Sequence, residues 1–537
     1  MTTDGQSRGD LKAVESPSGP ALQLQYALRT EDHGFVQLKK IIEPQPADET
    51  PVTFLLKAQA ASDLEVKFVS RNGSIFWVKW PLSSRFPEWT RITLRQSDLD
   101  YGWGGNGRYD GMAEFHVAVS GQGTGTVWLA DIGLSEPEEP STITRDAAKR
   151  NDPGLIYVRR NTPQLDPQCD QPGLGFEQRR AEMMTPEDPL VLEWLKTMQD
   201  VSSPGRQVLP TTEDNELQTF NNALVAIAFI LKGEQERAER ILDFFATATA
   251  RDNQDRTLQN FFYKGEARGF YQAVALKTQD GIQALHSPDR DRWMGDMAWL
   301  LLAYTYHEQT YSGGRYKEIT QLLHELLVAW FIDSPRLPGG GYVQHGWRKG
   351  DIRLHEDNGH PEGNIDCYAV FTLIGETEKA LKIRTWLEAE VTGDSQPLDL
   401  YTWRVLAYNG ARGDLLKIPD CDLRYRKTVT VNGRKATGPY HSAEPDVNNI
   451  WLDGLGHLAC AFFAAGDPQR GAFYANQFDA FLMDSTLGGK HTRTLPYTAN
   501  GEGGFNFDQS KGYISVAAWY IFAKNAFNPM MLKKCGS

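Results

Sequence analysis

A helix–glycine–acid–helix unit recurs in the carboxyl-terminal half of the chain and limits the folds open to it. The three clearest copies are FILKGEQERAERILDFF at 229–245, FTLIGETEKALKIRTWL at 371–387 and FFAAGDPQRGAFYANQF at 462–478. In each copy an apolar helix ends at a glycine, the usual residue in the left-handed position after a helix. The acid that follows suits the positive start of the next helix. Repeated αα-hairpins predict either an open solenoid or a closed toroid.

The spacing of apolar residues extends the helical prediction beyond these copies. From about residue 215 they recur three or four positions apart, which places them on one helix face. The same pattern predicts further helices at 399–408 and 511–523, and a less regular helical hairpin at 301–327. The connecting loops are long, above all between 409 and 449, and long loops favour a closed barrel with a functional rim over a plain scaffold. We therefore predict an all-α toroid over 211–530.

The amino-terminal part of the chain has a different pattern. Over 21–135, short segments such as DLEVKFVS at 63–70 alternate apolar and polar residues between glycine-rich turns, which predicts a β-sandwich or jelly roll. Residues 1–20 are polar, and we expect them to be disordered. Residues 136–210 are rich in proline and predict a linker that wraps along the next domain, with a short helix near 189–199. The chain is thus predicted to be multidomain.

Composition excludes several classes of protein. The net charge is −13 and Lys and Arg form no cluster, so no nucleic-acid partner is expected. No run of apolar residues is long enough to span a membrane, and none precedes residue 20 as a leader would. We therefore expect no membrane association, and a cytoplasmic location unless a leader has been removed. Aromatic residues make up 11% of the chain, which suits sugar stacking but also fits an aromatic-rich core.

The cysteines show neither a disulfide framework nor a zinc pattern. Their number is odd, their spacing is wide, and no CxxC or Cys/His motif is present. They are Cys169, Cys367, Cys421, Cys460 and Cys535. No disulfide, metal or other cofactor is predicted from them.

Five polar motifs mark helix starts or loops beside them. In a toroid the inner helices start at one rim, so such motifs converge on one cleft. They are NNAL at 221–224, MGDMAW at 294–299, GHPEGNIDCYAVF at 359–371, NIWLDGLGHLA at 449–459, and the loop and helix at 493–522.

Four acids in these motifs are candidate catalytic groups. Glu362 and Asp366 are four positions apart, so both carboxylates face the same side of a helix. A pair of carboxylates is what acid-catalysed glycoside cleavage needs, because one protonates the leaving oxygen while the other activates water or attacks. Asp296 and Asp453 each lie next to a glycine and near a tryptophan. The alternative for all four is a structural one, as helix caps or buried hydrogen-bond partners.

The predicted substrate contacts are polar and aromatic residues of the same motifs and the loops around them. They are Asn222, Trp299, Trp347, His355, Asn364, Tyr368, Trp451 and Glu502. The stretch RLHEDNGHPEGN at 353–364 also invites a metal-site hypothesis, but it lacks the HExxH spacing and favours a solvated loop.

From NNAL through GDMAW, PEGNIDCYAVF and WLDG to AWYIFAKNAFNP, the chain resembles the six-hairpin (α/α)6 glycosidase superfamily over roughly 215–530. The resemblance implies an (α/α)6 toroid, and a carbohydrate substrate. Members include hydrolases of β-glucans and related glycans, epimerases and lyases. Toroid proteins of this kind often carry His where this chain has Gly363. The amino-terminal region resembles a carbohydrate-binding jelly roll in LEVKFVSRNGSIFWVKW, FPEWTRITL and TVWLADIGL.

Three hypotheses follow from the residues and the resemblance together. The first is a glycoside hydrolase that cleaves a β-linked glycan or oligosaccharide. Glu362 would be its general acid, and Asp453 or Asp296 would be the base that activates water. The anomeric configuration is expected to be inverted. The second is a sugar epimerase or polysaccharide lyase, in which His355, His360 and His457 would carry protons. The third is a non-catalytic glycan-binding protein, in which the acids would face separate surfaces.

Overall fold

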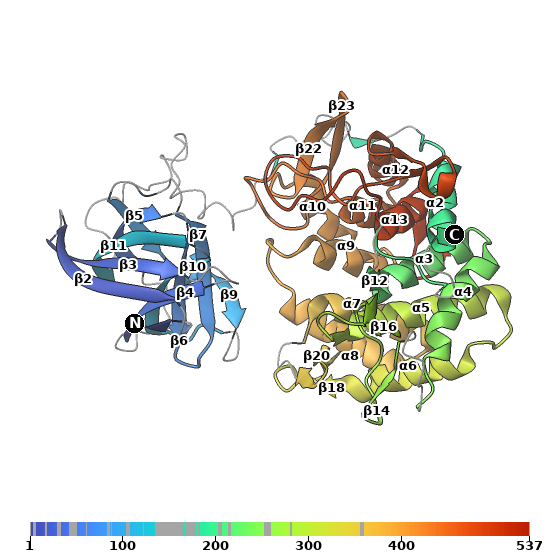
Figure 1. Cartoon of the computed structure of the whole chain (residues 1–537), viewed down its shortest axis with the longest axis horizontal. Coiled ribbons are helices and arrows are strands. Elements are labelled where there is room, and N and C mark those ends of the chain that lie inside the picture. The colour runs from blue at the N-terminus through green and yellow to red at the C-terminus, as the bar shows by residue number, and fades with distance from the viewer. Residues whose placement is uncertain are drawn as a thin grey trace. The chain divides into compact units, whose positions relative to one another are not determined.

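The computed structural model describes most of the chain, and everything below concerns these residues. They are 2–3, 7–16, 19–28, 34–41, 51–60, 62–82, 86, 89–103, 108–121, 123–134, 165–166, 169, 179–180, 183–201, 207–212, 216–251, 259–279, 282–354 and 359–535. The chain divides into two compact units, Met1–Thr162 and Pro163–Ser537 (Figure 1). The first unit is rich in β-strands and the second in helices.

The β unit contains two antiparallel sheets. The six-stranded sheet has the order β1-β4-β10-β6-β7-β9, and the five-stranded sheet has the order β2-β3-β11-β5-β8. The strands are β1 (Thr2–Thr3), β2 (Arg8–Ser16), β3 (Gly19–Leu28), β4 (Gly34–Ile41), β5 (Val52–Ala60), β6 (Asp63–Ser70), β7 (Ile75–Pro81), β8 (Thr90–Leu94), β9 (Asp100–Trp103), β10 (Met112–Gly121) and β11 (Gly123–Leu134).

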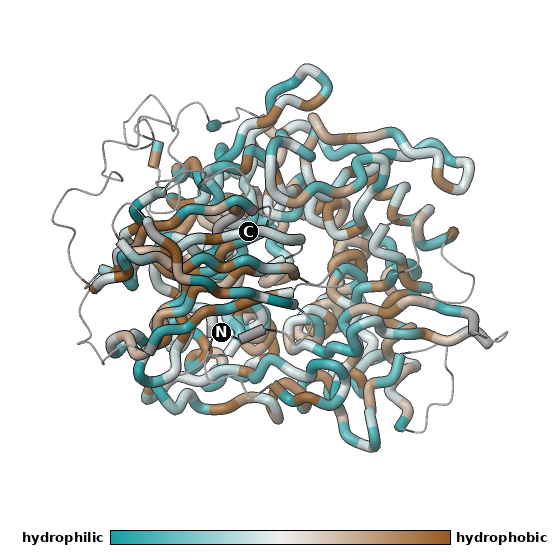
Figure 2. Tube along the Cα trace, turned by 60° about the vertical axis from the view of Figure 1, so that its left-hand side comes forward, coloured by the Kyte–Doolittle hydropathy of each residue, from teal (hydrophilic) through white to brown (hydrophobic). Residues whose placement is uncertain are grey.

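Alternating side chains join the two sheets through a shared apolar core. Every second residue of β6 is buried, beginning with Leu64, as the sequence alternation predicts. Hydrophobic and hydrophilic residues alternate along the strands in Figure 2. The rings of Phe54 on β5 and Phe115 on β10 lie 5.8 Å apart, so the two sheets touch across this core. The predicted β-rich amino-terminal region is confirmed.

The prediction of disorder over residues 1–20 is wrong for Arg8–Ser16. These residues form β2, which pairs with β3 along its length from Arg8 opposite Ala27 to Ser16 opposite Gly19. An edge strand needs only main-chain hydrogen bonds to one neighbour, and polar side chains suit its open side. Hydropathy therefore gave no sign of it.

Twelve α-helices lie in the described part of the helical unit. They are α2 (Pro189–Val201), α3 (Thr219–Leu231), α4 (Gln235–Thr247), α5 (Met294–Tyr311), α6 (Lys317–Trp330), α7 (Pro361–Ile374), α8 (Thr377–Glu390), α9 (Leu398–Ala407), α10 (Lys417–Cys421), α11 (Leu452–Ala464), α12 (Pro468–Gln477) and α13 (Ile514–Lys524). Helix α2 confirms the short helix predicted near 189–199.

Six of these helices form a closed series of contacts. Helix α3 packs against α5, α5 against α7, α7 against α9, α9 against α11, α11 against α13, and α13 back against α3. A second helix covers most of them from outside: α4 packs on α3, α6 on α5, α8 on α7 and α12 on α11, while α2 packs on α13. The hairpins of the sequence are thus pairs of one inner and one outer helix.

The two kinds of helix differ in sequence as their positions require. Helix α3, TFNNALVAIAFIL, is apolar on nearly all sides, and all but two of its residues are buried. Helix α4, QERAERILDFFAT, buries one face only, through residues such as Ile241 and Phe245. The glycines between paired helices adopt positive φ as predicted, with values of 74° at Gly233, 87° at Gly375 and 80° at Gly466.

Short strands lie in the connections between helices and after the last helix. They are β12 (Glu216–Gln218), β13 (Phe262–Tyr263), β14 (Glu266–Ala267), β15 (Ala273–Gln279), β16 (Ile282–His286), β17 (Arg292–Trp293), β18 (Phe331–Asp333), β19 (Gly341–Val343), β20 (Gly346–Arg348), β21 (Ile352–Leu354), β22 (Arg426–Val431), β23 (Arg434–Pro439), β24 (Met483–Ser485), β25 (Thr492–Thr494), β26 (Phe527–Asn528) and β27 (Lys533–Lys534). Among the described residues, no helix is both long and apolar enough to cross a membrane.

A disulfide corrects the expectation drawn from the cysteine pattern. Cys169 and Cys421 are bonded although 252 positions separate them, so spacing along the chain could not reveal the pair. Beside the bond, Arg179 forms an ion pair with Asp420 at 2.8 Å, and Arg426 forms one with Asp166 at 2.6 Å. Three described residues of the predicted linker, Asp166, Cys169 and Arg179, are therefore fastened to the helical unit near α10.

Candidate functional site

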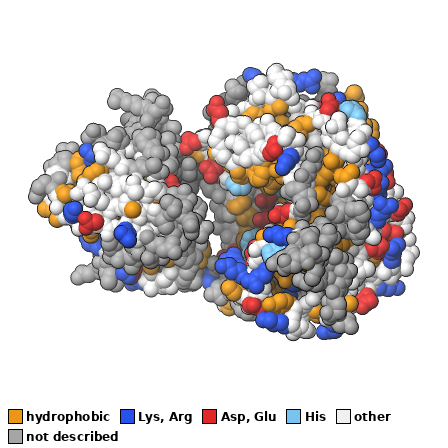
Figure 3. Space-filling view, in the orientation of Figure 1, with side chains coloured by type: hydrophobic (Ala, Val, Ile, Leu, Met, Phe, Trp, Pro, Cys, Tyr) orange, Lys and Arg blue, Asp and Glu red, His pale blue; other side chains and the backbone are white. Residues whose placement is uncertain are grey.

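Four of the six inner helices begin with an acid in their first turn. These acids are Asp296 of α5, Glu362 of α7, Asp399 of α9 and Asp453 of α11. The first turns of α3, α5 and α7 meet at a cavity of about 330 Å³. The space-filling view shows acidic side chains at the bottom of a hollow in this unit, with histidines at its edge (Figure 3).

Two glycines let α5 and α7 approach each other at this cavity. A Cβ atom on Gly295 would lie 3.1 Å from Oδ2 of Asp366 and 3.7 Å from Cα of Gly363. A Cβ atom on Gly363 would lie 2.8 Å from the Met294 side chain. A side chain at position 363 would therefore require the end of the Met294 side chain to move.

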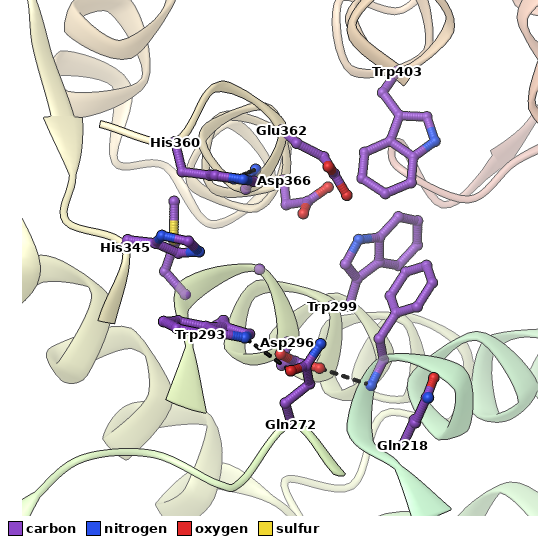
Figure 4. A pocket seen from close by; sticks show the side chains of 14 residues that line it. Gln218, Gln272, Trp293, Asp296, Trp299, His345, His360, Glu362, Asp366 and Trp403 are labelled. Atoms are coloured by element: carbon purple, nitrogen blue, oxygen red, sulfur yellow. Dashed lines mark hydrogen bonds between the residues drawn. The ribbon is translucent and has the colours of Figure 1, made fainter. Parts of the chain in front are cut away.

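A stack of three rings forms one wall of the cavity (Figure 4). The ring centroids of His360 and His345 are 4.3 Å apart, and those of His345 and Trp293 are 4.2 Å apart. The indole N–H of Trp293 donates to the Gln272 side chain at 2.9 Å.

Three further aromatic rings form the opposite wall. Phe220 and Trp299 have centroids 5.4 Å apart, and Trp299 and Trp403 have centroids 5.8 Å apart. Figure 4 shows the carboxyl groups of Glu362, Asp366 and Asp296 between the two walls. A cavity with aromatic walls and acids between them offers apolar faces and hydrogen-bond acceptors together, as a sugar ring requires.

Burial raises the pKa of two of these acids toward or beyond neutral pH. Burial raises the pKa of Asp296 to about 7, and this side chain is 6% exposed. Its Oδ1 accepts the backbone N–H of Phe220 at 3.1 Å. Burial, followed by repulsion from Glu362, raises the pKa of Asp366 well above its usual range.

Glu362 and Asp399 form a second pair, and solvent reaches both. Burial and then repulsion from Asp399 raise the pKa of Glu362. Burial also raises the pKa of Asp399, while the nearby His441 side chain acts to lower it. Oδ1 of Asp399 lies 3.1 Å from Nδ1 of His457. The side chain of Asp399 is 13% exposed and Glu362 is half-buried, whereas Asp296, Asp366 and Asp453 are buried.

The structural alternative of helix capping does not describe Glu362 and Asp366. The residue that caps α7 is His360, whose ring Nδ1 accepts the Gly363 N–H at 3.4 Å. Glu362 stands in the first turn and Asp366 one turn later, on the side that faces the cavity. Of the predicted catalytic acids, Glu362, Asp296 and Asp366 line one cavity, while Asp453 is buried nearby, where burial raises its pKa to about 7.

Asn222 and Asn364, which were predicted to contact the substrate, form hydrogen bonds with the backbone. The Asn222 side chain accepts the N–H of Leu209 at 2.9 Å and donates to the carbonyl of the same residue. Asn364 makes the same two bonds to Val343, at 2.7 and 3.0 Å. Each amide therefore fixes a connecting segment to an inner helix, and its polar atoms are used by the backbone.

The remaining predicted contacts have other surroundings. Tyr368 packs against Tyr408 with centroids 4.8 Å apart, and the Trp347 ring is covered by the Arg268 guanidinium at 3.6 Å. Trp451 lies against His457 at 5.1 Å, on the Asp399 side. Glu502 is exposed on a loop that pairs with Asn448. Of the predicted contacts only Trp299 is among the described residues that line the cavity, and His355 lies outside the described residues.

Sequence reasoning missed several residues that matter here. Asp399, His345, Trp293 and Trp403 were not predicted as site residues. Asp399 occupies the second position of α9, the same position that Glu362 has in α7 and Asp453 in α11. A comparison of helix starts, together with the apolar character of the rest of α9, would have found it.

Comparison with known protein families and with curated proteins finds no match. Solved structures do match. A family 11 carbohydrate-binding module from Clostridium thermocellum, in complex with a beta-1,3-1,4-mixed-linked tetrasaccharide, is 14% identical, with 26% of this chain and 89% of that chain covered and a TM-score of 0.22. A glycosidase in complex with glucose is 12% identical, with coverages of 64% and 97% and a TM-score of 0.43. A bacterial glucoamylase complexed with acarbose is 11% identical, with coverages of 98% and 88% and a TM-score of 0.40. At these scores the likeness carries no functional argument, which rests on the site's own residues.

Proposed function

We propose that the helical unit is a glycoside hydrolase in which Glu362 is the general acid and Asp399 the base that activates water. One observation carries this proposal: two acids that solvent reaches stand at the starts of neighbouring inner helices, and repulsion from one of them, Asp399, raises the pKa of the other, Glu362. Repulsion from Asp399 favours the protonated form of Glu362, and His441 favours the ionised form of Asp399. Environments that separate two carboxyl groups in this way suit an acid and a base.

The reaction needs two proton transfers, one to the leaving oxygen and one from the attacking water. Glu362 donates its proton to the glycosidic oxygen as the bond to the anomeric carbon breaks. Asp399 takes a proton from the water that forms the new bond to that carbon. Because the two carboxyl groups come from different helices, we propose that a water fits between them. The configuration at the anomeric carbon is then inverted. Nδ1 of His457 lies 3.1 Å from Asp399 Oδ1, on the side of α11.

The same proposal covers the architecture and the other unit. We propose that the ring of inner helices α3, α5, α7, α9, α11 and α13, with its outer helices, is the (α/α)6 toroid that the sequence resembles. The β unit is proposed to be a carbohydrate-binding domain, on the resemblance of its strands to that class of jelly roll. Co-sedimentation of the full chain with insoluble glycans tests the second statement.

The test of the enzyme is a screen for hydrolysis followed by substitution. The full chain is incubated with α- and β-linked glucans and oligosaccharides, and new reducing ends are measured. Glu362→Gln is expected to lower turnover at least about a hundredfold, because a general acid contributes factors of that size and more. Glu378→Gln is the matched control, because Glu378 has the same position in the outer helix α8 and its side chain is 82% exposed.

The screen also separates the alternatives. Unchanged activity in Glu362→Gln would refute the acid assignment. A second candidate is supported by His345 and His360, two possible proton carriers in the cavity wall. A lyase of this kind would give an unsaturated product that absorbs ultraviolet light, and an epimerase would leave chain length unchanged. The absence of any product or bound glycan would favour a protein without a carbohydrate role.

A further inference from the structure

A group of aromatic rings stands beside Asp399 and Asp453, apart from the two walls of the cavity. We call it the 497–513 platform: Tyr497, Phe505, Phe507 and Tyr513. The ring centroids of Tyr497 lie 4.7 Å from Phe507 and 5.2 Å from Tyr513, and those of Phe505 and Phe507 lie 5.8 Å apart. Phe507 is 38% exposed, and the other three are partly exposed.

The loop that carries the platform is held by its own hydrogen bonds. The N–H of Phe507 donates to the Asn500 side chain at 3.0 Å, and the Asn449 side chain donates to the carbonyl of Phe505 at 2.9 Å. The N–H of Phe505 donates to the hydroxyl of Tyr440 at 3.1 Å. Gly504 has φ of 69°, and a Cβ atom there would lie 2.4 Å from that hydroxyl. The exposed rings are therefore presented by an ordered loop.

A backbone contact places the platform at the start of α11, next to Asp453. The N–H of Leu452, at the start of α11, donates to the carbonyl of Tyr497 at 3.1 Å, and Asp453 is the next residue. The Trp451 ring lies 6.4 Å from Tyr497 and 5.1 Å from His457, which is 3.1 Å from Asp399. Burial and then Asp453, Asp399 and Glu362 raise the pKa of Tyr497, which agrees with this position.

The platform and the cavity belong to different parts of the ring of helices. The cavity is lined by residues from α3, α5, α7 and α9 and the strands before them. The platform precedes α13 and touches the start of α11. Glu362 itself lines the cavity, and α9, which carries Asp399, packs against both α7 and α11.

We propose that the 497–513 platform is a second sugar-binding site, which stacks on the apolar face of the pyranose that leaves when the bond at Glu362 is cleaved. This inference rests on the proposed hydrolase and adds that its substrate occupies both sides of the acid pair. The ligand class is a neutral pyranose, because the exposed surface of the platform is aromatic.

Glycosyl fluorides test the platform, because their leaving group is too small to occupy it. Wild type, Phe507→Ala and the control Leu381→Ala are assayed with cellotriose, laminaritriose and maltotriose and with α- and β-glucosyl fluoride. Leu381 is 62% exposed on the outer helix α8. Phe507→Ala is expected to lower kcat/KM for the trisaccharide about three- to tenfold relative to kcat/KM for the fluoride, the size of one aromatic contact. Equal losses on both substrates, or no loss on either, would overturn the platform.

Binding without turnover separates this inference from the proposed function. Glu362→Gln, alone and together with Phe507→Ala, is titrated with the same trisaccharides while intrinsic fluorescence is followed. A weaker affinity in the double variant, by about three- to tenfold, supports the platform even if the wild type hydrolyses none of the probes, in which case the hydrolase proposal falls by itself. Equal affinities, or no binding of any trisaccharide, overturn the platform.

Discussion

Replacement of Asp296 by asparagine is expected to stabilise the protein as pH rises. The side chain is 6% exposed at the start of α5, and burial raises its pKa from 3.8 to about 7. Asparagine has nearly the same shape, keeps an oxygen to accept the N–H of Phe220, and carries no ionisable proton. The substitution therefore removes the titration while keeping the hydrogen bond.

The magnitude follows from the two pKa values. A rise from 3.8 to about 7 corresponds to about 4 kcal/mol, at about 1.4 kcal/mol per pH unit. The folded state holds this proton more tightly than the unfolded state, so the free energy of unfolding of the wild type falls as pH rises from about 4 to about 7. About 2–3 kcal/mol of that fall lies between pH 5 and pH 8. This part of the fall in the free energy of unfolding is absent in Asp296→Asn.

Urea unfolding followed by tryptophan fluorescence measures the effect. The difference in unfolding free energy between Asp296→Asn and wild type should move by about 2–3 kcal/mol in favour of the variant between pH 5 and pH 8. Asp414→Asn, at a side chain that is 66% exposed, should show no such movement. If the curves for Asp296→Asn and wild type run parallel with pH, the argument that Asp296 is protonated by burial is refuted.

Three further predictions concern pH, glycine and the disulfide. The profile of kcat/KM against pH should be bell-shaped, with both limbs at a higher pH than the ordinary carboxyl range. The reason is that burial raises the pKa of Asp399, while burial and then repulsion from Asp399 raise the pKa of Glu362. An optimum near pH 4 would contradict this. Gly346→Ala should lower the free energy of unfolding by at least about 3 kcal/mol, because its Cβ would lie 2.1 Å from the carbonyl oxygen of Arg292. Gly375→Ala has a positive φ but no described atom within 4 Å, so it should lower this free energy by about 1 kcal/mol. Urea unfolding measures both. Cys169→Ser with Cys421→Ser should lower the free energy of unfolding by about 3 kcal/mol, and a reducing agent should bring the wild type to the same level without affecting the variant.

Local sequence signals gave the helices and part of the site. Gly233, Gly375 and Gly466 were recognised as helix ends because a positive φ is a property of single residues, and all three have it. Glu362 and Asp366 were recognised because four positions along a helix place two side chains on one face. Their cavity position agrees with that geometry, while their catalytic role stays a prediction.

Asp399 shows where local signals end. It opens α9 as Glu378 opens α8, and both acids stand at the second position of a helix. Their side chains are nevertheless 13% and 82% exposed, because α9 belongs to the inner ring and α8 to the outer layer. The remainder of each helix carries the distinction: α9 is LDLYTWRVLA, and α8 is the charged TEKALKIRTWLEAE.

Long-range partners could not be predicted from one sequence. Cys169 meets Cys421 across 252 positions of chain that include several helices, and β2 pairs with a neighbour, β3, that its own residues do not reveal. The ring stack of the cavity is similar, since Trp293, His345 and His360 come from three separate segments. Such contacts depend on the finished fold.

The acids at helix starts show how one sequence pattern yields two chemical states. The positive end of a helix favours an ionised carboxylate. At the outer helix α8 this tendency is reinforced, because Lys379 and His324 hydrogen-bond Glu376 and lower its pKa. At the inner helices the result is reversed, since burial raises the pKa values of Asp296, Glu362, Asp399 and Asp453 in spite of the helix end. Burial therefore outweighs the helix dipole at the rim. A substrate that expels water from the cavity increases that burial, and would strengthen the hold of Glu362 on the proton it must donate until the leaving oxygen takes it.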